Sequence, residues 1–241
     1  MKLSVVIIAQ NEEAKIADCI ESARFCDDIV LIDDCSIDRT KQIAEELGAR
    51  VYVNKMLGYA TQKNLGIRKA KNDWVFILDA DERISPELQQ SISKLEPGAN
   101  TAGYEMPFRN HVKGKWLRHG GLYPDYHTRL FNRLKGKYGE REVHEMLELD
   151  GEVKKLKGDV VHLTYDTYGA YLRKVKKYSA VQAQEDVRTS GGAVSTKGAF
   201  REFASRYVKQ KGLLDGWAGF VSALYLAYYA HLYNRSVKRA L

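Results

Sequence analysis

The chain has 241 residues, of which 44% are hydrophobic and 29% are charged, so we expect an ordinary folded protein and not a disordered one. Its net charge of +7 is uneven: residues 1–150 carry 22 Lys/Arg and 24 Asp/Glu, whereas residues 151–241 carry 16 and 7. A basic C-terminal part suits a polyanionic neighbour. The sequence has no recognisable nucleic-acid-binding motif, so we expect no nucleic-acid partner.

The first 95 residues alternate short apolar runs with helical patterns, which predicts βαβ units around a parallel sheet. The predicted strands are Leu3–Ala9, Ile29–Ile32, Val51–Val53 and Trp74–Leu78. We expect helices capped by Asn11, by Ser36 with Asp38, and by Ser85 before Pro86, together with a helix over Thr61–Ala70. The three cysteines form no C-x-x-C pair, which fits reduced thiols in a cytoplasmic protein.

From Gly103 the pattern changes to mixed strands and Gly-rich loops, including a hairpin-like pair at Val153–Lys155 and Val160–Leu163. The remainder predicts helices over Tyr168–Arg188, Phe200–Gln210 and Leu213–Lys238. The fold class is therefore α/β: a mostly parallel, Rossmann-like sheet flanked by helices, with a helical C-terminal extension. We place the two parts at residues 1–165 and 166–241.

Acidic residues follow two of the predicted strands at the point where each strand ends. Asp33 and Asp34 follow the second strand, and Asp79 and Asp81 follow the fourth. Ligands of open α/β sheets bind outside the carboxyl ends of the strands. A D-x-D pair there suits one Mg2+ or Mn2+ with substrate phosphates, and the other pair suits a base and a ribose.

Each acidic cluster also has a purely structural interpretation. Asp79-Ala-Asp-Glu82 is compatible with a solvated turn before a capped helix, and a lone D-x-D is common. Asp33 or Asp38 is equally able to cap the helix near Ser36. The metal and nucleotide interpretation depends on both clusters lying at one edge of the sheet.

The motifs in order along the chain resemble a known family. They are Ser4-Val-Val-Ile-Ile-Ala-Gln-Asn-Glu12, Ile32-Asp-Asp-Cys-Ser-Ile-Asp38 and Ile77-Leu-Asp-Ala-Asp81. Together they resemble family 2 glycosyltransferases of GT-A fold. Two later motifs, Pro124-Asp-Tyr-His-Thr-Arg-Leu-Phe131 and Arg141-Glu-Val-His-Glu145, are similar to a bacterial branch that contains lipopolysaccharide-core β-1,4-glucosyltransferases.

The resemblance implies inverting transfer of a sugar from a nucleotide-diphosphate donor, with uridine diphosphate as the nucleotide and glucose as the best guess for the sugar. It places Asp34 near the nucleobase with Asp33 beside it, and Gln10 and Asn11 in the nucleoside pocket. It also places Asp79 near the ribose and Asp81 on the metal. The acceptor would be a hydroxyl of a lipopolysaccharide-core or other lipid-linked glycan.

Inversion in one step needs a base for the acceptor proton, and the Glu-Asp pair that many family members carry for this role is missing. Three carboxylates remain as candidates: Glu145, Glu142 and Asp125, of which we favour Glu145. His144 is a candidate metal ligand, although a single histidine is more often structural. Arg129 lies within a resembling motif and is a candidate contact of a phosphate or of the acceptor, with a solvated loop charge as the alternative.

Processive synthases of the family carry a Gln-x-x-Arg-Trp motif, which is absent from the sequence, so we expect the addition of a single sugar. Residues 216–230 are uncharged and rich in aromatic side chains, with Lys and Arg on both flanks. This pattern predicts a helix lying on an anionic membrane. With the lipid-linked acceptor that the resemblance implies, the enzyme would be peripheral on the cytoplasmic face of the inner membrane. A helix packed on the protein itself is the alternative.

Two other functions fit parts of the sequence. Sugar-nucleotide nucleotidyltransferases use related folds, but they open with a Gly-rich loop where this chain has Gln10-Asn11-Glu12-Glu13. A non-catalytic adaptor that docks on a membrane is the second alternative. The adaptor alternative would leave the acidic clusters without a function.

Overall fold

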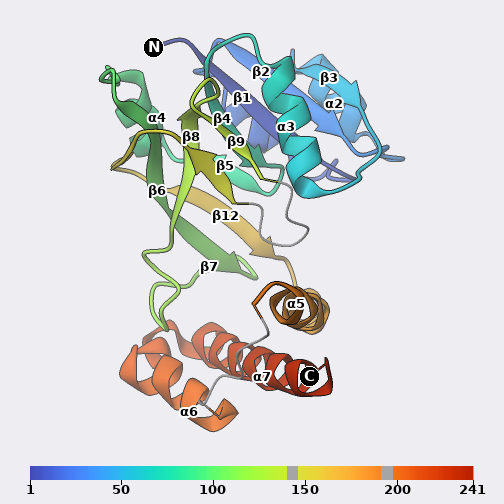
Figure 1. Ribbon diagram of the computed structural model, residues 1–241, viewed down its shortest axis with the longest axis vertical. Helices are drawn as coiled ribbons and strands as arrows, with labels where there is room; N and C mark the ends of the chain where they lie inside the picture. The colour runs from blue at the N-terminus through green and yellow to red at the C-terminus, as the bar shows by residue number, and fades with distance from the viewer. Residues whose placement is uncertain (140–145, 191–197, 241) are drawn as a thin grey trace. The chain divides into compact units, whose positions relative to one another are not determined.

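The computed structural model describes residues 1–139, 146–190 and 198–240 (Figure 1). These residues form two compact units: Met1–Phe108 with Tyr126–His162, and Arg109–Asp125 with Leu163–Leu241. The second unit therefore takes a segment from the middle of the chain in addition to the C-terminal helices. The predicted boundary between a catalytic part (residues 1–165) and a helical extension (residues 166–241) stays a prediction.

Four parallel strands form one half of the main sheet. They are β1 (Leu3–Ala9), β2 (Asp28–Asp33), β3 (Arg50–Val53) and β4 (Trp74–Asp79), in the order β3-β2-β1-β4. All four strands were predicted from buried apolar runs, and the structure confirms them. Parallel order places their carboxyl ends at one edge of the sheet.

The other half of the sheet is mainly antiparallel, so the sheet is mixed. β8 (Tyr126–Asn132) pairs antiparallel with both β4 and β6 (Thr101–Val112). The order continues to β12 (Val160–Tyr165) and β5 (Glu82–Ile84), while β11 (Glu152–Lys155) and β7 (Lys115–Trp116) pair with β6. β9 (Gly136–Tyr138) and β10 (Leu147–Leu149) form a separate antiparallel pair. The predicted hairpin is wrong, because β11 and β12 pair with different strands.

Helices cover both faces of the parallel strands (Figure 1). They are α1 (Ile16–Ser22), α2 (Thr40–Glu46), α3 (Tyr59–Lys69) and α4 (Pro86–Ser93). Val5 and Ile7 point into the core shared with α1, α2 and α4, whereas Val6 joins the core under α3. This alternation follows from the two-residue period of a strand, which places successive side chains on opposite faces of the sheet.

The structure corrects two of the predicted helix starts and confirms the third. Asn11 has φ 54° and does not cap a helix, since α1 begins at Ile16. α2 begins at Thr40, whose backbone N–H donates to Asp38 Oδ1, so the helix starts after Ser36. Ser85 caps α4 as predicted, because its hydroxyl accepts from Leu88 N–H at 3.3 Å.

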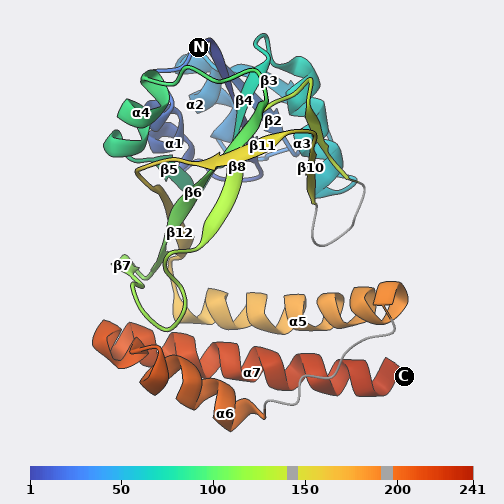
Figure 2. The same ribbon diagram turned by 60° about the vertical axis from the view of Figure 1, so that its left-hand side comes forward.

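The second unit is mainly helical (Figure 2). Its helices are α5 (Tyr168–Ser190), α6 (Ala199–Ala204), the π-helix Ser205–Lys209, the 3-10 helix Gly212–Asp215 and α7 (Gly216–Ala240). α7 lies between α5 and α6 (Figure 2). Within the described ranges, no helix is long and apolar enough to cross a membrane.

Gly66 on α3 allows the helix to approach the sheet, and its replacement tests that packing. A Cβ there would lie 2.2 Å from Val6 Cγ1 and 3.2 Å from Ile32 Cγ1, both in buried strands. We expect Gly66→Ala to lower the free energy of unfolding by about 1–3 kcal/mol in urea, because the overpacking outweighs the better helix propensity of alanine. Gly98→Ala is the control, since its nearest atom lies at 3.6 Å. Unchanged stability of Gly66→Ala would contradict the close approach.

Candidate functional site

The two acidic clusters lie at the same edge of the first unit. β1 lies between β2 and β4, with Ala9 opposite Asp33 and Ile8 opposite Asp79. Two strand spacings separate the clusters by roughly 10 Å. The condition set by the sequence, that both clusters share one edge, is therefore met.

Arg129 holds two carboxylates at the end of β4. Its Nη2 donates to Glu82 Oε1 at 2.8 Å and to Asp79 Oδ2 at 3.2 Å. Glu82 Oε2 accepts from the backbone N–H of Asp79 at 2.9 Å. Glu82 is fully buried, whereas the Asp79 side chain is 37% exposed. The guanidinium thus locks the turn that carries Asp81.

Asp79 and Glu82 both contact Arg129, but their pKa values shift in opposite directions. Burial raises the pKa of Glu82 to about 7, and the neighbouring Asp79 charge acts in the same direction. Partial burial also opposes ionisation of Asp79, but the charges of Arg129, Lys63 and His162 overcome this effect and lower its pKa to about 2. Asp79 is therefore ionised at neutral pH, while the buried Glu82 holds a proton up to near neutrality.

Asp81 lies beside a histidine that the sequence analysis did not single out. His162 Nε2, from β12, is 3.5 Å from Asp81 Oδ2, and about a quarter of the Asp81 side chain is exposed. Burial lowers the pKa of His162, but the hydrogen bond to Asp81 and the charges of Glu82 and Asp79 raise it above its usual value overall. Asp81 is therefore partly exposed, and it is not one of the two carboxylates that accept hydrogen bonds from Arg129.

Aromatic rings and a lysine enclose the same cluster. The Phe108 ring has the Arg129 guanidinium at 5.2 Å and the His162 ring at 6.2 Å. Lys63 is buried, with its ammonium 5.0 Å from the Tyr138 ring, and its charge helps to lower the pKa of Asp79. Lys63 therefore places a positive charge in this cluster, which suits the binding of an anionic group of a ligand.

The predicted nucleoside residues form a second, connected loop. Gln10 Nε2 donates to the Asp34 carbonyl at 3.2 Å, and Asp34 Oδ1 accepts from Met56 N–H at 2.8 Å. Asp33 Oδ2 accepts from Ser36 N–H, while its buried Oδ1 lacks a hydrogen-bond partner among the described residues. Asn11 Oδ1 accepts from Ile37 N–H, which ties the loop after β1 to the loop after β2. Asp33 therefore has both a structural role and a spare acceptor.

The structure leaves the general base untested. Asp125 belongs to the second unit, where its Oδ2 accepts from Asn110 Nδ2 at 3.3 Å. Glu142, His144 and Glu145 lie outside the described residues. Within the described ranges there is no group of three or more His, Cys, Asp or Glu side chains arranged to hold a metal ion.

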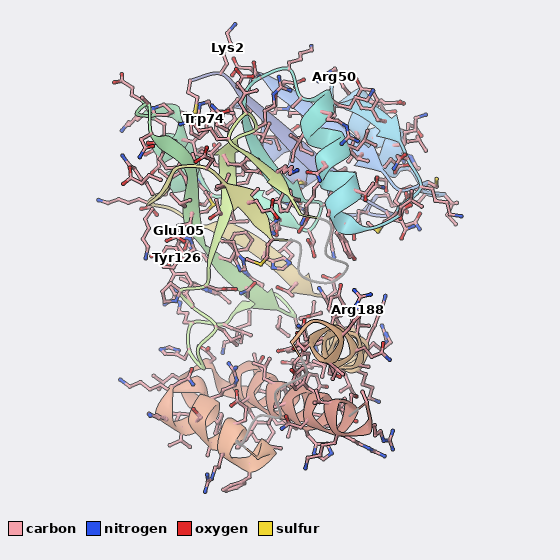
Figure 3. All side chains as sticks on the ribbon, in the orientation of Figure 1. Lys2, Arg50, Trp74, Glu105, Tyr126 and Arg188 are labelled. Atoms are coloured by element: carbon pink, nitrogen blue, oxygen red, sulfur yellow. The ribbon has the colours of Figure 1, made fainter. Side chains whose placement is uncertain are left out.

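Charged pairs elsewhere in the first unit have structural roles. Arg50 forms a bidentate pair with Asp28, with N–O distances of 2.9 and 3.0 Å. Arg50 and Trp74, labelled in Figure 3, are the first residues of β3 and β4 and so lie where these strands begin, whereas the acidic clusters lie where strands end. The position at the carboxyl edge, and not charge alone, distinguishes the candidate site.

The proton on Glu82 makes stability depend on pH. Between its ordinary pKa of 4.5 and about 7, the unfolded chain releases a proton that the folded chain keeps, so this group favours folding less as pH rises through that window. From pH 5 to 8 we expect the wild-type free energy of unfolding to fall by on the order of 2–3 kcal/mol more than that of Glu82→Gln.

Urea unfolding at several pH values measures this difference. Glu87→Gln, an exposed change on α4, is the matched control and keeps the wild-type slope. Parallel pH profiles for wild type and Glu82→Gln would show that Glu82 is ionised throughout the window.

Comparison with known proteins agrees with this geometry. The sequence profile of the family described as "Glycosyl transferase family 2" matches residues 4–147. The lipopolysaccharide core biosynthesis glycosyltransferase LpsC of Rhizobium meliloti (strain 1021) is 28% identical over 243 residues, covering 96% of this chain and 90% of LpsC.

Two solved structures are also similar. A crystal structure of a mycobacterial protein covers 78% of this chain and 74% of its own, with 17% identity and a TM-score of 0.53, and it shares the fold. The crystal structure of glucosyl-3-phosphoglycerate synthase from Mycobacterium tuberculosis with Mn2+, uridine diphosphate and phosphoglyceric acid covers 45% of this chain and 43% of its own, with 24% identity and a TM-score of 0.40. The family profile spans more than half of this chain, including both acidic clusters. The chain belongs to glycosyl transferase family 2.

Proposed function

We propose that this glycosyltransferase moves one sugar, with inversion, from a uridine diphosphate donor to a hydroxyl of a lipid-linked glycan. The observation that carries the proposal is the shared edge, where the Asp33–Asp34 loop and the Asp79–Asp81 turn flank β1. One cluster suits the nucleoside and the other suits the diphosphate. Absence of the Gln-x-x-Arg-Trp motif supports single addition over processive synthesis.

The nucleoside half of the site supports this assignment through its acceptors. The spare Asp33 Oδ1 is buried and suits a ring N–H or a ribose hydroxyl, since an unpaired buried acceptor is costly without a ligand. Asp34 Oδ1 is already engaged by Met56 N–H. Gln10 and Asn11 fix the loop geometry.

The diphosphate half suits Mg2+ or Mn2+ held by Asp81. Such ions commonly use one or two carboxylates with substrate phosphates as the remaining ligands, so a three-residue protein cluster is not required. The partly exposed Asp81 supplies an oxygen donor, and Asp79 stays ionised beside it. When bound, the ion neutralises the charge that develops on the leaving diphosphate. Lys63 supplies a further positive charge near Asp79.

The acceptor proton needs a separate carboxylate. Glu82 has a pKa near 7, but it is fully buried and engaged by Arg129 and the Asp79 N–H, so an acceptor hydroxyl does not reach it. Glu145, Glu142 and Asp125 remain the candidates, with Glu145 favoured. The base would take the proton as the hydroxyl oxygen attacks the anomeric carbon from the face opposite the diphosphate.

The name of one relative supports the proposed acceptor. LpsC is named for lipopolysaccharide core biosynthesis, and this chain spans 90% of it. We propose a lipopolysaccharide-core or similar glycolipid acceptor, with glucose as the transferred sugar. The enzyme would then work peripherally on the cytoplasmic face of the inner membrane.

A donor screen tests the proposal without knowledge of the acceptor. Slow hydrolysis of uridine, guanosine and other nucleotide sugars is measured with Mn2+, with Mg2+ and after EDTA treatment. We expect a uridine diphosphate sugar to turn over fastest, with release of uridine diphosphate, and EDTA to abolish the release. Turnover of a nucleoside triphosphate with a sugar phosphate would instead support the nucleotidyltransferase alternative.

Asp81→Asn tests the role of the carboxylate that we assign to the metal. The amide keeps the size of the side chain but removes the charge, so we expect turnover to fall at least about 100-fold and Mn2+-dependent binding of uridine diphosphate to weaken in parallel. Asp18→Asn on α1, whose side chain is 82% exposed, is the control and keeps wild-type activity. Wild-type turnover in Asp81→Asn would remove Asp81 from the mechanism.

A further inference from the structure

The second unit exposes several large apolar side chains between residues 200 and 224. Val208, Leu214 and Trp217 are 61%, 59% and 66% exposed. Phe200, Leu213 and Leu224 are also exposed. We refer to these six residues, on α6, the two short helices and the first turns of α7, as the apolar face. Contiguous exposed apolar patches mark interaction sites more often than isolated residues do.

Aromatic contacts hold the apolar face together. Trp217 stacks on Phe220 with ring centroids 5.3 Å apart, and Phe220 contacts Phe203 and Tyr207 edge-on at 5.7 and 5.6 Å. Trp217 and Leu224 are seven residues apart, which places them on one side of α7. These ring contacts fix the first turns of α7, which carry Trp217, against α6 and the π-helix.

The tyrosine-rich part of α7 is not available for the same purpose. Tyr225, Tyr228 and Tyr229 pack against the cluster that includes Tyr171 and Val175 of α5. Tyr233 Oη donates to Asp186 Oδ2 of α5 at 2.7 Å. The segment expected from sequence to lie on a membrane thus packs partly on the protein, and the exposed surface is the beginning of α7 with the turns before it.

The exposed charged side chains on the described helices that carry the apolar face are all cations. Arg201, Lys209 and Lys211 are exposed. The two acidic residues of the described part after residue 197 are engaged internally: Glu202 pairs with Arg206 at 2.7 Å, and the buried Asp215 accepts from His119 N–H at 2.8 Å. The surface therefore combines exposed leucines, tryptophan and phenylalanine with unopposed cations.

We propose that the apolar face docks on an anionic lipid bilayer, with Trp217 and the leucines at the headgroup boundary and the cations on lipid phosphates. Tryptophan favours that boundary, and each nearby Lys or Arg strengthens attachment to anionic lipid. A second copy of the chain is a poorer occupant, because the cations of both copies would face each other. The inference rests on the proposed lipid-linked acceptor for its purpose, but it is measured separately.

Co-sedimentation of the full chain with sucrose-loaded vesicles tests the docking. The vesicles are phosphatidylcholine alone or phosphatidylcholine with one quarter phosphatidylglycerol. We expect binding to the anionic vesicles, and at least about tenfold weaker partition for the combined variant Leu213→Ser, Leu214→Ser, Trp217→Ser. Lys209→Glu with Lys211→Glu removes the preference for anionic vesicles. Brominated lipid quenches wild-type tryptophan fluorescence more than it quenches that of Trp217→Phe.

Matched controls separate this result from unfolding and from failure of the proposed function. Leu134→Ser with Val153→Ser replaces exposed apolar residues of the first unit and keeps wild-type partition. Donor hydrolysis without lipid reports whether each variant retains its site. The docking surface is overturned if the combined variant partitions like the wild type. It is also overturned if the wild type binds no vesicles but self-associates, and the same substitutions abolish that self-association. If the wild type binds vesicles but hydrolyses no donor, only the catalytic proposal is overturned.

Discussion

The candidate site depends on one guanidinium shared by two carboxylates. Arg129 comes from β8, whereas Asp79 and Glu82 lie on either side of the turn after β4, so the contact joins the antiparallel half of the sheet to the parallel half. Removal of a buried partner leaves an uncompensated charge, which costs about 3–5 kcal/mol. The same contact keeps Asp79 ionised and leaves Asp81 outside the ion pair, facing solvent.

A buried and an exposed carboxylate in one turn have different tasks. Glu82 accepts from a backbone N–H and from Arg129, so its oxygens are satisfied and it stabilises the shape of the turn. Asp81 has solvent on one side and His162 on the other, so a ligand reaches it without breaking the fold. Functional groups need this support from neighbouring residues, because a loosely held carboxylate loses its position.

The parallel half of the fold could be predicted from sequence, since each buried strand is a short apolar run with polar residues at its end. The rule that parallel strands share a carboxyl edge then brought Asp33 and Asp79 together correctly. His162 could not be predicted, because it meets Asp81 only through the antiparallel pairing of β12 with β5. Nor could the role of Asn11, whose side chain bonds across to the loop after β2 instead of capping α1.

The second unit shows why composition alone does not tell which side chains of a helix are exposed. The aromatic and uncharged run in α7 predicted a helix lying on a membrane, but helical geometry divides the run between two sides, because every third or fourth residue returns to the same side. Ala218, Val221 and Ala227 are buried, while Trp217 and Leu224 are exposed. The sequence predicted the chemistry of the segment, and packing decided which side chains remain free. A surface made from a few residues of each short helix needs the turns at Lys211 and Gly216, whose consequences appear only in three dimensions.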